Sequence, residues 1–195
     1  MRIDSHAIMD AMQIEKDPKT KTYAYIDGAN LDKGTSELGW RIDYQKFYVW
    51  LNDKFKIDTA YMFIGHVPKY KNLYNKMRNA GFTLVFKDTS NVGYGQVKGN
   101  CDADLILHVA RGVYETEINK AIIVSSDGDF SCLIKFLQEK EREVIILSPS
   151  RKCSIFLMRT GSAITYLDDV KNNISLSQSI IKEKAPDEDE TSQGS

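Results

Sequence analysis

Cysteine and histidine are scarce in this 195-residue chain, and neither residue type forms a recognisable metal-binding pair. The three cysteines, Cys101, Cys132 and Cys153, are odd in number and widely spaced. This usage is typical of reduced thiols in a cytosolic protein, and it excludes a CxxC zinc or redox motif. The sequence therefore predicts a cytoplasmic protein without a zinc site.

Long apolar runs are also missing. No stretch approaches the roughly 20 apolar residues that span a bilayer. Residues 1–17, MRIDSHAIMDAMQIEKD, mix acids with apolar residues, so they lack the continuous apolar core of a signal peptide. The chain is 42% hydrophobic and 27% charged, which is an ordinary globular balance with enough length for one well-buried core. We expect a single globular domain and no membrane partner.

Charge is unevenly distributed along the chain, although its net value is only −1. The run Asp187–Glu190 carries four negative charges, which leaves a net charge of +3 on residues 1–186. Between His66 and Lys98 there are six lysines and arginines and a single acid, Asp88. A solvated helix explains part of this excess, but a basic region beside acidic strand ends fits a polyanionic substrate better.

The stretch Ala121–Phe130, AIIVSSDGDF, is the most informative in the sequence. Its first four residues are apolar and are followed by turn residues, which predicts a buried strand of a parallel sheet. From Phe130 the apolar residues follow a helical repeat, with Asp129 in the N-cap position. Asp127 and Asp129 are thus expected at the carboxyl end of a central strand, the edge where open α/β sheets bind ligands.

The remaining pattern alternates strands with helices and predicts a three-layer α/β/α fold around a mainly parallel sheet of five to six strands. Gly28–Asn30 is interpreted as a tight turn, and Thr89–Gly99 as a polar loop. The other expected strands are Thr22–Asp27, Thr59–Ile64, Phe82–Phe86, Glu143–Leu147 and Ala163–Leu167. The expected helices are Tyr44–Phe55, Tyr70–Asn79 and Asp102–Val113, with a short helical turn at Ser154–Met158.

The domain is expected to occupy residues 22–170. Residues 1–21 form an N-terminal extension, and residues 171–195 form a C-terminal extension that is acidic near its end. From about residue 182 the composition is typical of disorder.

In the helix Asp102–Val113, helical spacing separates two acids. Asp102 precedes Leu105 and Ile106 by one turn and so shares the side that faces the core. Asp104 aligns with His108 and Arg111 on the opposite, polar side. We therefore expect Asp102 to point toward the sheet, whereas Asp104 is interpreted as a surface charge.

Asp27, Asp102 and the Asp127/Asp129 pair all stand where a strand ends or a helix begins. Carboxylates gathered at one edge repel one another and raise each other's pKa values, and a divalent cation removes that penalty. Oxygen ligands without histidine or cysteine favour Mg²⁺ or Mn²⁺.

Three segments resemble the motifs of a known family. YIDGAN at 25–30, VKGNCDADL at 97–105 and IIVSSDGDF at 122–130 are similar, in order and spacing, to the motifs of the NYN domain in its LabA-like branch. The resemblance covers about residues 23–167. That family belongs to the PIN-like nuclease superfamily, so the resemblance implies a PIN-like fold and a metal-dependent ribonuclease.

The resemblance also implies a set of site residues. By position, the catalytic and metal-binding acids are Asp27, Asp102, Asp127 and Asp129, with Mg²⁺ or Mn²⁺ as the cofactor. Asn30 and Ser125 become supporting polar residues. Ser126 departs from the pattern, because it stands where the family's third motif commonly has glycine. Its hydroxymethyl group is expected to narrow the site or to add a hydrogen bond to Asp127.

The expected partner is RNA, single-stranded or structured. Lys69, Lys71 and Lys98 lie near strand ends, and Tyr94 could stack on a base. Two alternatives stay open: a non-catalytic RNA-binding or regulatory module, and, less favoured, a phosphotransfer protein for which Asp168-Asp169 would be the acidic pair. A homo-oligomeric state also stays open.

Overall fold

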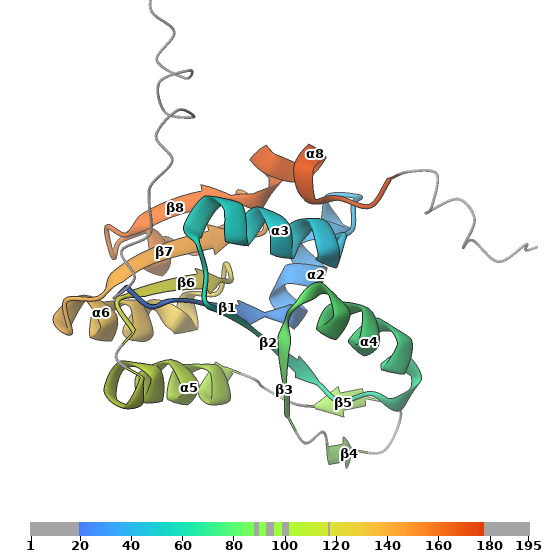
Figure 1. Ribbon diagram of the computed structural model, residues 1–195, viewed down its shortest axis with the longest axis horizontal. Helices are drawn as coiled ribbons and strands as arrows, with labels where there is room; N and C mark the ends of the chain where they lie inside the picture. The colour runs from blue at the N-terminus through green and yellow to red at the C-terminus, as the bar shows by residue number, and fades with distance from the viewer. Residues whose placement is uncertain (1–19, 88–89, 93–95, 99–101, 117, 178–195) are drawn as a thin grey trace, which may run out of the picture.

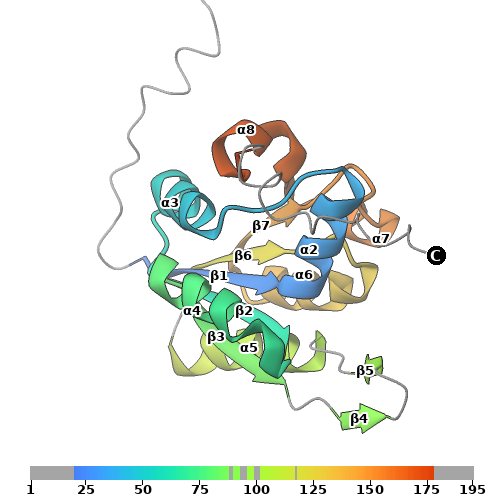
Figure 2. The same ribbon diagram turned by 90° about the vertical axis from the view of Figure 1, so that its right-hand side faces the viewer.

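The fold is a six-stranded parallel sheet between two layers of helices (Figures 1 and 2). The computed structural model describes residues 20–87, 90–92, 96–98, 102–116 and 118–177. The strand order is β3-β2-β1-β6-β7-β8. These strands are β1 (Thr22–Asp27), β2 (Thr59–Gly65), β3 (Thr83–Lys87), β6 (Lys120–Val124), β7 (Glu143–Ser148) and β8 (Ala163–Tyr166). The predicted three-layer α/β/α class is confirmed.

The helices fill the connections between strands. The α-helices are α2 (Gly28–Glu37), α3 (Tyr44–Phe55), α4 (Lys71–Ala80), α5 (Asp102–Glu115), α6 (Ser131–Glu139), α7 (Ile155–Met158) and α8 (Lys171–Ile174). The 3-10 helices are η1 (Pro68–Tyr70), η2 (Gly128–Phe130) and η3 (Leu167–Val170). Among the described residues, no helix is long and apolar enough to cross a membrane.

Two hydrophobic cores lie on the two faces of the sheet. Helices α2, α3, α4 and α8 cover one face, where Phe47 and Leu51 pack with Ile26 and Met62. Helices α5, α6 and α7 lie on the other face, where the buried residues include Tyr25 and Phe63. Alternate residues of β1 therefore enter different cores, as expected for a strand buried on both faces.

Helix α5 lies close to β1 because it has a glycine at the contact. A Cβ atom on Gly112 would lie 2.6 Å from the Tyr25 hydroxyl oxygen, too close for any other residue without a shift. Leu105, Val109 and Val113 are buried on the same side of the helix. This packing fixes α5 against the sheet and sets the position of its first residue, Asp102.

The strand order reverses between β1 and β6, the two central strands of the sheet. Ile26 pairs with Val124, so β1 and β6 end side by side, and Asp27 and Ser125 follow at neighbouring positions. The chain crosses from β1 toward β2 and β3 on one side and from β6 toward β7 and β8 on the other. Such a switch point leaves a crevice at the carboxyl ends of the central strands.

Two local predictions were wrong. Gly28–Asn30 is not a tight turn but the first turn of α2, capped by Asp27, whose Oδ1 accepts from the Asn30 backbone N–H at 3.1 Å. Asp129 is not an N-cap: Asp127 caps η2 instead, accepting from the Asp129 N–H at 3.0 Å, and α6 begins only at Ser131. A 3-10 turn between strand and helix displaces the cap by two residues.

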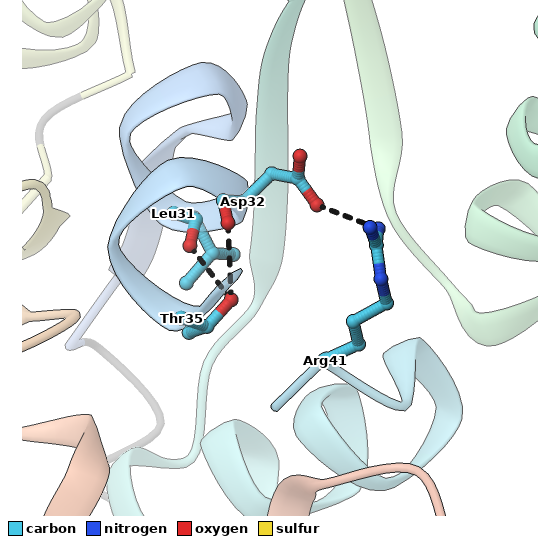
Figure 3. A network of polar contacts seen from close by, with 4 residues as sticks. All are labelled: Leu31, Asp32, Thr35 and Arg41. Atoms are coloured by element: carbon cyan, nitrogen blue, oxygen red, sulfur yellow. Dashed lines mark hydrogen bonds and ion pairs between the residues drawn. The ribbon is translucent and has the colours of Figure 1, made fainter. Parts of the chain in front are cut away.

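The sequence of α2 shows little of the apolar periodicity that is usual in helices. Its inward residues are Leu31 and Thr35, and the Thr35 hydroxyl donates to the Leu31 carbonyl at 3.0 Å (Figure 3). On its outer side Asp32 forms an ion pair with Arg41, at 3.5 Å (Figure 3). The other predicted helices and sheet strands are present, with ends that differ by at most two residues.

The predicted loop Thr89–Gly99 contains two short antiparallel strands, β4 (Ser90–Val92) and β5 (Gln96–Lys98). Past the sheet, η3 and α8 return the chain to α3. Ile174 is fully buried there, and Ser175 forms an isolated bridge with Ile42.

Candidate metal centre

Three acids from two segments of the chain meet at the carboxyl edge of the sheet. Asp102 begins α5, Asp127 follows β6, and Asp129 lies in η2. One carboxylate oxygen of each lies within 4.8 Å of those of the other two. Asp102 and Asp127 are half-buried and Asp129 is exposed, so the group opens to solvent on one side. We call this set the acid cluster.

Asp27 lies beside the acid cluster and is 7% exposed. Burial is the main cause that raises the pKa of its carboxyl group, and the charges of Asp102 and Asp127 raise it further. Hydrogen bonds from the Asn30 N–H and the Ser125 hydroxyl act in the opposite direction. The charged form of Asp27 is thus held next to other negative charges, an arrangement that a bound cation relieves.

Ser125 and Asn30 form a polar frame around the acids. The Ser125 hydroxyl donates to Asp27 Oδ2 at 3.3 Å and accepts from the Asp127 backbone N–H at 3.1 Å. The Asn30 side-chain oxygen accepts from the backbone N–H of Ser126 at 2.9 Å. These contacts tie the end of β6 to the start of α2; that Asn30 and Ser125 support a functional site stays a prediction.

Ser126, at the usual glycine position, is accommodated without backbone strain. Among the described residues, only Lys56 and Glu141 combine a side chain with a left-handed backbone. The Ser126 hydroxyl donates to the Asn30 side-chain oxygen at 3.0 Å. The added hydrogen bond therefore goes to Asn30, and the expectation that it goes to Asp127 was wrong.

The turn that carries Asp127 and Asp129 is braced by the segment before α7. The Ser154 backbone N–H donates to the Ser126 carbonyl at 3.1 Å. A Cβ atom on Gly128 would collide with the Ser154 hydroxyl and would lie 3.1 Å from Phe156 Cδ2. Sequence reasoning missed Gly128 and Ser154, because a glycine between two aspartates looks like ordinary turn chemistry.

The acid cluster fits Mg²⁺ or Mn²⁺ better than zinc. Its ligand atoms are all carboxylate oxygens, and neither histidine nor cysteine joins the group within the described part of the chain. Hard divalent cations select oxygen ligands. Because Asp129 is exposed, water or a phosphate oxygen could reach a cation held by the three acids.

Asp104 lies outside the acid cluster, as its helical position predicts. Its side chain is about half exposed and pairs with Lys87 at 3.8 Å. The two histidines that the structure describes are also elsewhere: His108 packs on Tyr61, and His66 packs on Phe86.

Of the four predicted substrate-binding residues, the structure describes the side chains of Lys69 and Lys71. Lys69 lies in η1 with its ammonium group 5.0 Å from the centre of the Tyr70 ring. Lys71 is the exposed first residue of α4. Tyr94 lies outside the described residues, as does the side chain of Lys98, whose backbone belongs to β5. These four assignments stay predictions.

The fold and the acid cluster define a PIN-like α/β protein with a carboxylate site at its switch point. The model of the NYN domain family matches residues 21–168, so the chain belongs to the NYN domain family. This family is nuclease-like in general and groups with PIN-like nucleases.

One solved structure similar to this chain is a protein of unknown function from Vibrio parahaemolyticus RIMD 2210633. The two share 23% sequence identity with a TM-score of 0.70, over 84% of this chain and 100% of the other. That likeness supports the fold alone. No curated protein matched the chain.

Proposed function

We propose that this protein is a metal-dependent ribonuclease of the LabA-like branch of NYN domains, acting in the cytoplasm. The observation that carries the proposal is the acid cluster, in which the start of α5 and the turn after β6 bring three carboxylates within 4.8 Å of one another beside the buried Asp27. An arrangement that concentrates negative charge is costly by itself, and binding a divalent cation offsets that cost.

Asp102, Asp127 and Asp129 would hold Mg²⁺ or Mn²⁺, with Asp27 as a further ligand or as a buried charge behind them. When bound, the cation supplies Lewis acidity, which polarises the phosphodiester and lowers the pKa of a bound water. The chain's own part is to orient the acids: Ser125 holds Asp27 and the Asp127 backbone, and Asn30 holds the backbone of Ser126. Neither a Ser-His-Asp nor a Cys-His arrangement accompanies the cluster in the described residues, so hydrolysis without a covalent intermediate is the chemistry this site favours.

RNA is the proposed substrate, with Lys69, Lys71, Tyr94 and Lys98 as contacts outside the acid cluster. The lysines would attract phosphates, and Tyr94 would stack on an unpaired base.

The two acids considered for the phosphotransfer alternative, Asp168 and Asp169, both interact with other side chains. Asp168 accepts a hydrogen bond from the indole nitrogen of Trp40 at 3.2 Å, and Asp169 pairs with Arg151. Both acids have structural partners near η3. A non-catalytic RNA-binding role on the same fold is the second candidate, because half-exposed carboxylates occur without chemistry.

The test is cleavage of labelled single-stranded RNA with Mn²⁺, with Mg²⁺ and with EDTA. Asp127→Asn should lower the rate by more than about 100-fold, since it removes a ligand and not merely an outer-shell partner. Asp53→Asn is the matched control: it removes the same charge from an exposed residue of α3, on the other side of the sheet, and should leave the rate nearly unchanged.

Equal losses in the two variants would contradict the assignment of the site. Full activity in EDTA would contradict the metal. Absence of cleavage under all three conditions, with RNA still bound, would favour the binding module.

A further inference from the structure

A groove separates the edge strand β3 from α5, next to the acid cluster. Its volume is about 400 Å³, within the range of sites that hold small organic ligands. One wall consists of Val85, Phe86 and Lys87 from β3, and the other includes Leu107, His108 and Arg111 from α5. We call this the β3–α5 groove.

The groove lies on the same face of the sheet as Asp27. Asp27 pairs with Phe63 and Phe63 with Val85, so these side chains form one row across β1, β2 and β3. Lys87 stands two residues beyond Val85 and shares that face. Two strand spacings separate β1 from β3, or about 10 Å.

Helix α5 joins the groove to the acids. Asp104, which also lines the groove, is two residues after Asp102 and one helical turn before His108. A chain lying along the groove toward its Asp104 end therefore runs toward the start of α5, which carries Asp102 of the acid cluster.

The α5 wall of the groove carries a flat ring in a fixed position. The centre of the His108 ring is 4.4 Å from that of Tyr61 and 5.5 Å from that of Phe63. Burial, followed by the charge of Arg111, lowers the pKa of His108, so the imidazole is mostly neutral at pH 7. Leu107 beside it is 56% exposed and adds apolar surface. A ring and an aliphatic side chain at one wall suit a nucleobase.

Cations border the same space. Lys87 and Arg111 both line the groove, and among its described lining residues the single acid is Asp104, which pairs with Lys87 at 3.8 Å. Arg111 pairs with Glu115 at 3.7 Å, but both side chains are 65% exposed. Exposed pairs of this kind are weak, so the guanidinium can turn to a phosphate at little cost.

We propose that the β3–α5 groove binds one nucleotide of single-stranded RNA beside the phosphodiester that lies at the acid cluster. The base packs against His108 and Leu107, and the flanking phosphates lie near Lys87 and Arg111. The identity of the ligand as RNA rests on the proposed function, whereas the presence of a nucleotide subsite rests on the groove itself.

The test measures binding rather than cleavage. Full-length protein carrying Asp127→Asn is titrated into a labelled oligouridylate with Ca²⁺ replacing the active metal, and Kd is read from fluorescence anisotropy. Leu107→Glu adds a carboxylate at an exposed helical position and should raise Kd at least about tenfold, by repelling phosphate and displacing the base.

Val49→Glu is the matched control. Val49 is an exposed aliphatic residue of α3, at 47%, on the other side of the sheet, and its change adds the same charge. It should leave Kd within about twofold of the parent value. Because both positions are exposed, both variants should keep the parent Tm. Equal Kd values for the two variants would overturn the proposal.

Salt dependence provides a second matched pair. Arg111→Ala should flatten the slope of log Kd against log salt by up to about 0.7, the value for one lost phosphate contact on a single strand. Arg41→Ala removes an arginine from a comparable exposed ion pair on the opposite face and should not (Figure 3). An equal change in both slopes would show that the two arginines attract RNA only through the overall charge of the protein. It would overturn the proposed contact between Arg111 and a phosphate.

Duplex RNA with the same number of phosphates should compete poorly, because its bases are not free to enter the groove. Equal competition would overturn base insertion. These outcomes are independent of catalysis: if the parent protein cleaves RNA but Leu107→Glu binds normally, only the groove proposal fails. If cleavage is absent but Leu107→Glu loses binding, only the proposed ribonuclease fails.

Discussion

The two faces of the sheet differ in how completely they are covered. On the face of α2, α3, α4 and α8, helices extend to the edge strand, and Tyr74 and Met77 of α4 are buried over β2 and β3. On the face of α5 and α6, Tyr61 of β2 stays partly exposed, whereas Ala60 and Met62 on the other face of that strand are fully buried; the edge strand β3 is partly exposed on both faces. Both the acid cluster and the β3–α5 groove lie on this second face. Both faces have a buried core, and the candidate site occupies the side on which β2 leaves room for a ligand.

The largest effect expected from this comparison concerns packing. Phe47→Ala removes a fully buried ring from the covered face and should lower the free energy of unfolding by about 3–5 kcal/mol. Tyr61→Ala removes a larger side chain from the open face, yet part of its surface already meets water. Its cost should be about 2 kcal/mol or less. Denaturant unfolding followed by circular dichroism gives both values, and equal costs would contradict the difference between the faces.

A somewhat smaller effect is expected from metal binding on the open face. Saturating Mn²⁺, at about 100 times its Kd, should raise the free energy of unfolding by about 2.7 kcal/mol. Asp102→Ala should abolish this response and slightly stabilise the metal-free protein, because the charge of Asp102 raises the pKa of its neighbour Asp27. Asp104→Ala is the control and should keep the response. Thermal scans with Mn²⁺ and with EDTA measure both changes, and an intact response in Asp102→Ala would remove that residue from the site.

The same titration at lower pH tests the role of Asp27. Its pKa is raised in the folded protein above the ordinary 3.8, so the folded state binds a proton more readily than the unfolded state. In EDTA, this group therefore contributes stability at low pH that is lost as pH rises from 3.8 through the raised pKa. Metal binding requires the deprotonated acid, so the Mn²⁺ response should weaken as pH falls through the same window.

The smallest effect concerns the link between the two faces, where Asn30 of α2 holds the turn after β6. Ser126→Gly removes the hydroxyl hydrogen bond to Asn30 but keeps the backbone one, and should cost about 1 kcal/mol. Asn30→Ala removes the acceptor for both donors and should cost more. Denaturant midpoints compare the two, and a stabilised Ser126→Gly would show that the serine strains the turn.

The sequence could predict what depends on strong periodicity. Residues such as Tyr44, Phe47 and Leu51 repeat at helical spacing and predict a helix. The apolar run 121–124 is followed by turn residues and predicts a buried strand. Helix α2 was missed because it buries only Leu31 and Thr35 and contains Gly34, which lies close to Pro149. Its stability comes from tertiary contacts and from the Asp27 cap, which no local pattern reveals.

The candidate site could also be predicted from the sequence only where a local pattern determines it. Helical spacing was enough to separate Asp102 from Asp104, because the side of a helix is a local property. The same spacing put His108 on the polar side of the helix with Asp104 and left both a core and a surface position open for it; the structure places it against Tyr61. Which side of a helix meets water depends on how far the sheet extends beneath it, and that is decided by strand order. The β3–α5 groove could therefore be found only in the assembled fold.

The pairing of β1 with β6 also bears on the order in which the protein folds. Asp27 and Ser125 are in hydrogen-bond contact across 98 residues of chain, whereas β2, on the other side of β1, follows it much sooner. Contacts between distant segments form slowly, because the intervening chain must lose entropy before they add stability. During synthesis, β1, β2 and β3 emerge well before β6, and β1 then has one unpaired edge. Asp27 thus meets the acid cluster only when the second half of the sheet docks, so metal binding that depends on Asp27 reports completed folding.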